Sequence, residues 1–135
     1  MPDSLRKVLI CEDDETIRLM MTRALQRAGY EVESVPNGRE AIAKLDSDRF
    51  DLIVLDLMMP DVDGFEVAQY LSENAPRRLK RVVVTTALPP SMMERLPAGI
   101  CTILPKPFDI QDFLSHAHDC SDDTLTRGRK PEAQA

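Results

Sequence analysis

Short stretches rich in β-branched and aliphatic residues alternate along this chain with longer stretches in which apolar residues recur every three or four positions. Strand patterns that alternate with amphipathic helix patterns are typical of a parallel sheet covered by helices on both faces. The sequence therefore predicts an α/β protein with a doubly wound, five-stranded parallel sheet. The strands are expected at residues 8–11, 31–35, 51–56, 81–86 and 100–104.

The third expected strand has a continuous apolar interior at residues 52–55. A strand that is covered on both faces requires such an interior, so this strand is predicted near the centre of the sheet. Between the fourth and fifth strands, residues 88–98 contain three prolines. Because prolines bound any helix in this segment, we expect only about two turns there.

Four longer helices are predicted. The first is expected to end before Gly29, which suits a C′ position, and the second begins at Asn37, which forms a start similar to a capping box with Glu40. The third follows Gly64, and the fourth begins near Ile110. The buried face of the first helix is predicted to contain Ile17, Met20, Met21, Ala24, Leu25 and Ala28.

A length of 135 residues allows one domain, which we place at residues 1–120. Residues 121–135 lack apolar periodicity and are expected to form a flexible tail or the start of a linker. A net charge of −6 argues against general nucleic-acid binding, and the densest basic cluster, within residues 77–81, is interpreted as a solvated loop. No run approaches the ~20 apolar residues of a membrane span, and a cytoplasmic location is expected.

Three cysteines, Cys11, Cys101 and Cys120, are odd in number and far apart in the sequence. This usage favours reduced thiols over a disulfide framework. His116 lies one helical turn before Cys120, as two zinc ligands do, but the sequence offers no second pair for a closed site. A zinc site is therefore not expected.

Polar residues gather at the predicted carboxyl ends of four strands, which is the edge where open α/β sheets bind ligands. They are Glu12, Asp13 and Asp14 after the first strand, Asp56 at the end of the third, Thr85 and Thr86 at the end of the fourth, and Lys106 after the fifth. Carboxylates donated by different strands repel one another unless a cation lies among them, and oxygen ligands indicate Mg²⁺. A carboxylate can attack a phosphoryl group when a metal and a fixed cation shield the incoming charge, and Asp56 is placed for that role.

Four separated segments, EDDETIR, LIVLDLMMPDVDGFE, VVVTTA and LPKPF, resemble the receiver domains of two-component response regulators over about residues 6–119. The segments occur in the family's order at the predicted strand ends, which makes the resemblance specific. It implies a flavodoxin-like receiver fold and a signalling domain, not an enzyme. It also implies a histidine kinase or phosphotransfer protein as phosphoryl donor and an unidentified downstream protein, with no direct nucleic-acid binding and no membrane contact.

The same resemblance assigns roles to the acidic residues. Asp56 is expected to be the phosphoacceptor, and Glu12 and Asp13 are expected to be the acidic pair that holds Mg²⁺. Asp56 itself and the backbone carbonyl of Met58 complete the expected protein ligands, whereas Asp14 falls outside the pair.

The resemblance also implies that Thr86 and Lys106 contact the phosphoryl oxygens, Lys106 as a compact point charge. Thr85 competes for the hydroxyl role, but neighbouring strand residues point to opposite faces, and Thr86 directly precedes an alanine as the family pattern requires. A cis peptide is expected before Pro107.

Ile103 occupies the position that usually holds a switching aromatic residue, three residues before the lysine. Together with the proline-rich segment, this substitution predicts a non-standard output surface at residues 87–103. We hypothesise that phosphorylation draws Thr86 toward Asp56 and shifts residues 87–98 directly. The apolar Met58 and Leu88 are expected to hinder attacking water and so to slow autodephosphorylation.

Two alternative functions stay open. A Mg²⁺-dependent phosphatase could use the same residues, but Asp56 is followed by LMMPD, which leaves no acid two residues later to act on a leaving group. A receiver-like docking module that is not phosphorylated is the second alternative, because the region around Ile103 departs from the family pattern.

Overall fold

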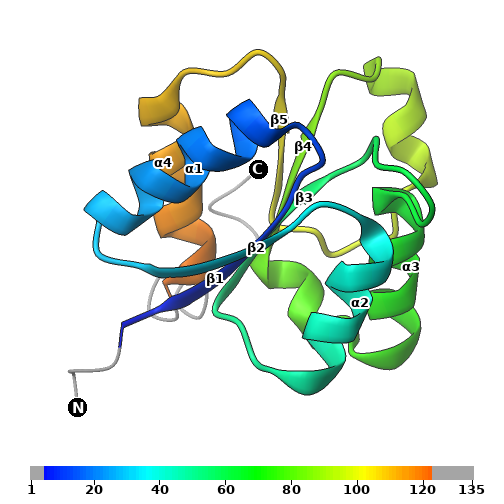
Figure 1. Ribbon diagram of the computed structural model, residues 1–135. Helices are drawn as coiled ribbons and strands as arrows, with labels where there is room; N and C mark the ends of the chain where they lie inside the picture. Colours follow the sequence, from blue (N-terminus) through cyan, green and yellow to red (C-terminus); the bar gives the residue numbers. More distant parts are fainter. Residues whose placement is uncertain (1–4, 123–135) are drawn as a thin grey trace, which may run out of the picture.

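The computed structural model describes residues 5–122, in which a five-stranded, all-parallel sheet lies between two layers of helices (Figure 1). The strands lie in the order β2-β1-β3-β4-β5. The predicted doubly wound sheet with its third strand at the centre is therefore confirmed. The elements in chain order are β1 (Lys7–Cys11), α1 (Glu15–Arg27), β2 (Glu31–Val35), α2 (Gly38–Ser47), β3 (Leu52–Asp56), α3 (Gly64–Asn74), η1 (Pro76–Arg81), β4 (Val82–Thr86), η2 (Pro90–Arg95), β5 (Thr102–Pro105) and α4 (Ile110–Ser121).

The sheet separates two hydrophobic clusters. Helices α1 and α4 cover one face, and α2 and α3 cover the other (Figure 1). All five residues of β3 and all five of β4 are buried, as expected for inner strands with helices on both sides. Because β3 and β4 are buried along their whole length, their packing determines where each strand ends. It therefore also determines where the residues that follow each strand lie.

The four α-helices begin in the same way, with an Asp or Asn side chain that accepts a hydrogen bond from a backbone N–H of the first turn. The capping residues are Asp14, Asn37, Asp63 and Asp109. Such caps satisfy amides that have no partner within the helix. At the other end of α1, Gly29 has a φ of 99°, a conformation that glycine adopts without strain.

The buried face of α1 is narrower than predicted. Met21 and Leu25 are fully buried, but Met20 is 43% exposed and Ala28, at the C-cap, is also exposed. Met20 is one position, or about 100°, away from Met21 around the helix, which turns it toward solvent. The prediction that Met20 belongs to the core is wrong.

The prediction of reduced cysteines is wrong for two of the three. Cys101 and Cys120 form a disulfide with a Cα–Cα distance of 6.0 Å, whereas Cys11 is free. Cys101 directly precedes β5, and Cys120 lies in the last turn of α4, which packs back on the sheet. Sequence separation alone does not show this return of the chain. Burial raises the pKa of the Cys11 thiol, so this residue is a poor nucleophile.

The proline-bounded segment forms η2, a short 3₁₀ helix, which confirms the expectation of only a short helix there. The tail predicted from residue 121 lies outside the described residues from 123 onward, and Ser121 itself belongs to α4. Among residues 5–122, no helix has the length and apolar character needed to cross a bilayer.

Candidate functional site

The predicted site residues meet at the carboxyl edge of the sheet. Glu12 directly follows β1, Asp56 is the last residue of β3, Thr86 is the last residue of β4 and Lys106 directly follows β5. These four strands are parallel and lie side by side, so their carboxyl ends reach the same edge.

Three carboxylates and one ammonium group form the centre of this edge. One oxygen from each of Glu12, Asp13 and Asp56 can be chosen so that all three lie within 4.8 Å of one another. Lys106 Nζ lies 2.9 Å from Glu12 Oε1 and 3.3 Å from Asp56 Oδ1. Glu12 and Asp56 are 1% and 3% exposed, whereas Asp13 faces solvent. Glu12 and Asp56 are therefore buried, and Asp13 is the acid of this group that is accessible to solvent.

Glu12 is held at both its side chain and its backbone. Its Oε2 accepts a hydrogen bond from the backbone N–H of Asp14 at 3.1 Å, and its carbonyl oxygen accepts one from Arg18 Nη1 at 2.8 Å. Asp14 also caps α1, so its carboxylate is directed to the helix and not to the acidic group. That Asp14 lies outside the pair that would hold a metal stays a prediction.

The loop between β3 and α3 fits tightly against the end of β3. A Cβ atom on Gly64 would lie 2.3 Å from the carbonyl oxygen of Asp56 and 2.6 Å from Leu57 Cα, so no side chain fits at this position. Gly64 N donates to the Leu57 carbonyl at 3.1 Å. Asp63 and Glu66 form a complete capping box that fixes the start of α3 beside the site.

Burial and like charges act together on Asp56. Desolvation raises the pKa of its carboxyl, the nearby Glu12 carboxylate raises it further, and Lys106 lowers it, which leaves the pKa at about 7. Burial lowers the pKa of Lys106, but hydrogen bonds and charges from Glu12 and Asp56 outweigh this and raise it overall. The site thus holds a fixed cation next to a carboxylate that is costly to ionise in the absence of a further positive charge.

The two neighbouring threonines at the end of β4 differ in their hydrogen bonds. Both are buried. Thr86 Oγ1 accepts a hydrogen bond from the backbone N–H of Leu88 at 2.9 Å. Thr85 Oγ1 is buried without a hydrogen-bond partner in the part of the chain that the structure describes. The role of Thr86 toward a phosphoryl group, and that of the Met58 carbonyl toward a metal, stay predictions.

Two supporting features were missed from the sequence. The Asp63-x-x-Glu66 spacing at the start of α3 is a capping-box signal that the sequence contains and that we did not use. The close approach of Gly64 to the Asp56 carbonyl depends on the tertiary path of the loop, for which a single glycine gives no specific signal. The expected cis peptide between Lys106 and Pro107 is present.

Comparisons with known proteins agree with this geometry. Residues 8–118 match the family model described as the response regulator receiver domain. Response regulator MprA of Mycolicibacterium vanbaalenii is 39% identical over 115 residues, which cover 81% of this chain and 47% of MprA. The chain therefore spans about half the length of the curated relatives it matches.

Solved structures show the same likeness. Chemotaxis protein CheY4 of Vibrio cholerae has a TM-score of 0.75 and 34% identity over 92% of this chain and 98% of its own. Response regulator protein TrrA of Thermotoga maritima, in complex with Mg²⁺-BeF, has a TM-score of 0.77 and 25% identity over 86% of this chain and 99% of its own.

The sheet topology and the acidic edge define a signalling domain of the receiver class. The chain belongs to the response regulator receiver domain family and is a receiver domain of two-component signalling. The family membership predicted from the four sequence segments is therefore confirmed.

Replacing Asp56 by Asn is expected to stabilise the metal-free protein at alkaline pH. Because the folded-state pKa of about 7 is above the ordinary value of 3.8, the native state binds this proton more tightly than the unfolded chain. This more tightly bound proton contributes to the stability of the folded wild type at acidic pH. The contribution is lost as the pH rises through the folded-state pKa of about 7. We therefore expect Asp56→Asn to exceed the wild type by about 1–2 kcal/mol in unfolding free energy at pH 8 and by much less near pH 4.

Chemical denaturation in EDTA at a series of pH values measures this difference. Asp14→Asn is the matched control, because Asn caps a helix as well as Asp and Asp14 lies outside the acidic group. A lower stability of Asp56→Asn than of the wild type at pH 8 would contradict the account of the site.

Proposed function

We propose that this receiver domain accepts a phosphoryl group from a phosphohistidine donor onto Asp56 in a Mg²⁺-dependent reaction. One observation carries the proposal: a buried Asp56 carboxylate lies within 4.8 Å of oxygens from two further acids and 3.3 Å from a lysine ammonium. Glu12 and Asp13 follow β1 and Asp56 ends the adjacent β3, so the fold itself places the three acids together.

The donor set fits Mg²⁺. All three side chains offer carboxylate oxygens, the ligand type that this hard cation prefers, and Lys106 alone leaves the group with an excess of negative charge. Glu12, Asp13 and Asp56 would hold the ion, together with the Met58 carbonyl. When bound, Mg²⁺ supplies positive charge that neutralises the carboxylates and the phosphoryl oxygens during transfer.

The residues of the chain have separate tasks in the transfer. An Asp56 carboxylate oxygen forms the new bond to phosphorus while the bond from phosphorus to the donor imidazole nitrogen breaks, and the imidazole leaves with that electron pair. Lys106, held between Glu12 and Asp56, supplies a fixed positive charge for the phosphoryl oxygens. Burial of Asp56 limits access of bulk water to the acyl phosphate.

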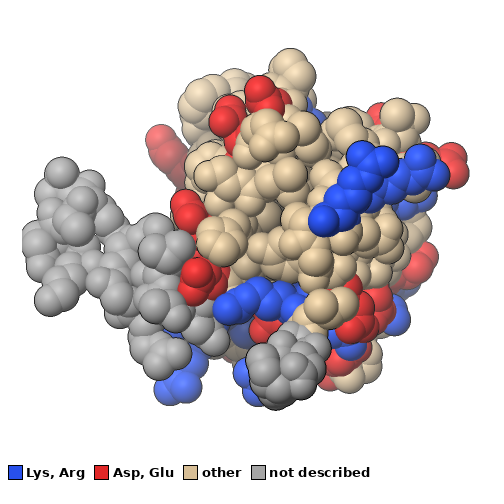
Figure 2. Space-filling view, turned by 90° about the vertical axis from the view of Figure 1, so that its left-hand side faces the viewer, with Lys and Arg blue, Asp and Glu red and all other residues tan. Residues whose placement is uncertain are grey.

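An apolar groove beside the site suits the donor protein. The groove has a volume of about 420 Å³ and lies between α1 and the turn that leads from β5 into α4. Its lining consists of Ile17, Met20, Ala87, Lys106, Pro107 and Phe108. The face that carries α1 and α4 shows mainly uncharged side chains at its centre (Figure 2). A donor protein that covers this surface would bring its histidine close to Asp56. Lys106, which lines the groove and contacts Asp56, would then lie beside the phosphoryl group during transfer.

The phosphatase alternative has little support from the site. Met58, two residues after Asp56, is 58% exposed, so an apolar side chain stands where an acid would be needed for the leaving group. The docking-module alternative has to explain why Glu12, Asp56 and Lys106 are held in a buried, ion-paired arrangement. Phosphoryl acceptance accounts for that arrangement directly.

The Thr86 hydroxyl offers a route from the site to the output segment. It accepts the Leu88 N–H, so a Thr86 side chain that turned toward a phosphoryl oxygen would release this hydrogen bond and the start of residues 87–98. Within that segment, the Arg95 guanidinium lies 4.0 Å from the centre of the Phe65 ring in α3. A shift of the segment would therefore alter a contact with α3.

Incubation of the protein with acetyl phosphate and Mg²⁺ is expected to add the mass of one phosphoryl group, because the site needs only a reactive phosphoryl donor. Intact-mass spectrometry should show this gain in the wild type and in Asp14→Asn but not in Asp56→Asn, and EDTA should abolish it. A folded wild-type protein that gains no mass at high acetyl phosphate would favour the docking module. Steady turnover of p-nitrophenyl phosphate would instead favour the phosphatase.

Thr86→Val is expected to uncouple the site from the output segment, because valine keeps the shape of threonine and lacks the hydroxyl. Amide spectra recorded with and without Mg²⁺ and beryllofluoride should show large shifts at residues 87–96 in the wild type. In Thr86→Val these shifts should fall to less than half while shifts next to Asp56 persist. Thr85→Val is the control, since the Thr85 hydroxyl has no partner within residues 5–122. Loss of the shifts in Thr85→Val but not in Thr86→Val would reverse the assignment.

A further inference from the structure

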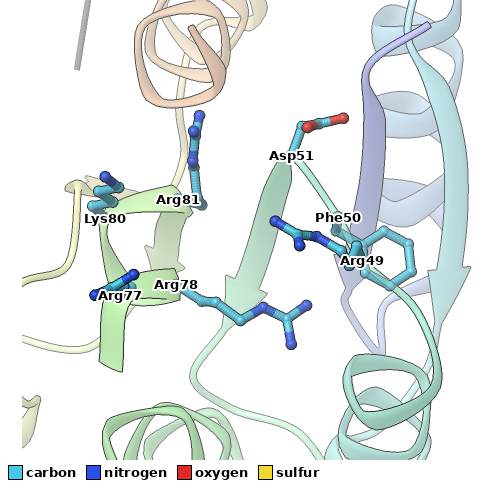
Figure 3. A pocket seen from close by; sticks show the side chains of 7 residues that line it. All are labelled: Arg49, Phe50, Asp51, Arg77, Arg78, Lys80 and Arg81. Carbon is cyan, nitrogen blue, oxygen red and sulfur yellow. The ribbon is translucent and has the colours of Figure 1, made fainter. Parts of the chain in front are cut away.

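A second polar pocket lies at the opposite edge of the sheet from Asp56. Asp51 directly precedes β3, and Arg81 is the last residue before β4, so the pocket is at the amino ends of the two strands whose carboxyl ends carry Asp56 and Thr86. It has a volume of about 520 Å³ (Figure 3). It is lined by Arg49, Phe50, Asp51, Arg77, Arg78, Lys80 and Arg81.

Five cations and a single acid line this pocket, although the chain as a whole has a net charge of −6. The acid does not neutralise them. Asp51 Oδ2 accepts a hydrogen bond from the backbone N–H of Lys7 at 2.8 Å, and its carboxylate points away from the arginines (Figure 3). The positive charge is therefore concentrated at this edge, away from the acidic group of the functional site.

Two of the arginines are fixed in place by the ends of helices. Arg78 Nη1 donates to the Leu45 carbonyl at 2.9 Å and Nη2 to the Asp48 carbonyl at 3.3 Å, at the end of α2. Arg81 Nη1 donates to the Ser121 carbonyl at 3.1 Å, at the end of α4. Cations at helix C-termini are favourable, and here they also hold guanidinium groups in defined positions before any ligand arrives.

Two acids near the remaining cations, Asp46 and Asp48, are engaged elsewhere, by Tyr70 and Lys7. Within residues 5–122, no ion pair joins Arg49, Arg77 or Lys80 to a carboxylate. Arg49 and Arg78 extend toward each other across the start of β3 (Figure 3). Burial lowers the pKa of Arg78 and the charge of Arg49 lowers it further, and the opposing effect of Asp46 does not outweigh them. An anion between these groups would relieve the repulsion.

We propose that this pocket binds a small multivalent phosphate ligand through a diphosphate or triphosphate group. Guanidinium groups match the oxygens of phosphate in pairs, and several cations around a concave surface suit an anion that carries several charges on few atoms. An extended acidic peptide would instead need a longer groove to place its carboxylates. The phosphate chain of a nucleotide and a free polyphosphate share the recognised chemistry. The site is independent of phosphoryl transfer at Asp56, so each can fail without the other.

Titration calorimetry of the full chain in metal-free buffer at fixed ionic strength tests the proposal. The probes are pyrophosphate, tripolyphosphate and ADP. Orthophosphate and sulfate, which carry fewer negative charges, are the references. We expect one saturable site with roughly tenfold or greater preference for the di- and triphosphates over sulfate. Tighter binding of ADP than of pyrophosphate assigns a nucleotide as the ligand, and equal binding assigns the phosphate chain alone. Either result supports the site.

Variants locate the binding. Arg49→Gln/Lys80→Gln removes two exposed cations that make no ion pair within residues 5–122, and we expect it to weaken pyrophosphate binding by roughly tenfold or more with an unchanged denaturation curve. Arg23→Gln/Arg39→Gln, at exposed positions of α1 and α2, removes the same number of positive charges as a control and should bind as the wild type does. Amide shifts should centre on residues 49–51 and 77–81.

Three outcomes would overturn the proposal. One is an affinity for pyrophosphate no higher than for sulfate. Another is an equal loss in the Arg23→Gln/Arg39→Gln control, which would mean non-specific attraction, or shifts centred on Lys106, which would mean binding at the other edge. The third is tighter binding of a polyglutamate peptide than of any phosphate probe, which would make the pocket a contact for an acidic protein segment.

Discussion

The central constraint in this molecule is the repulsion among three carboxylates that the fold forces together. Glu12, Asp13 and Asp56 come from the ends of two adjacent strands, and two of them are almost completely buried. Lys106 compensates only part of this charge, and burial together with the Glu12 carboxylate raises the pKa of Asp56. A protein keeps such an unfavourable arrangement when a further cation, or a reaction that needs the charge, makes it useful.

The surrounding structure holds the Glu12 and Asp56 carboxylates close together. The inner strands are buried along their whole length, which fixes where each one ends. The loop after β3 is pressed so closely on Asp56 that only glycine fits at position 64, and Asp63 caps the helix that follows. Lys106 is held by the same acids that it neutralises. A pocket at the opposite edge is lined by five cations and one acid, so its charge is opposite in sign to that of the acidic group.

The sequence predicted those parts that depend on local pattern or on strand topology. The continuous apolar run of β3 predicted a central strand, and the parallel topology predicted that Glu12, Asp56 and Lys106 would share one edge. The predictions from the sequence were wrong where tertiary contacts determine the structure. Met20 is one helical position from the buried face, and the Cys101–Cys120 pair forms only because α4 returns to the start of β5. The basic residues at 77–81, interpreted as a solvated loop, instead lie in the 3₁₀ helix η1 and line a pocket together with Arg49.

The most direct test of the central claim is a Mg²⁺ titration of the metal-free protein, followed by amide shifts and compared between the wild type and Asp13→Asn. The account predicts saturable binding at one site, with the largest shifts at residues 11–14 and 56–58, and a loss of affinity of roughly tenfold or more when Asp13 loses its charge. Shifts that do not saturate, or an affinity that is the same in Asp13→Asn, would show that the converging carboxylates do not form a metal site.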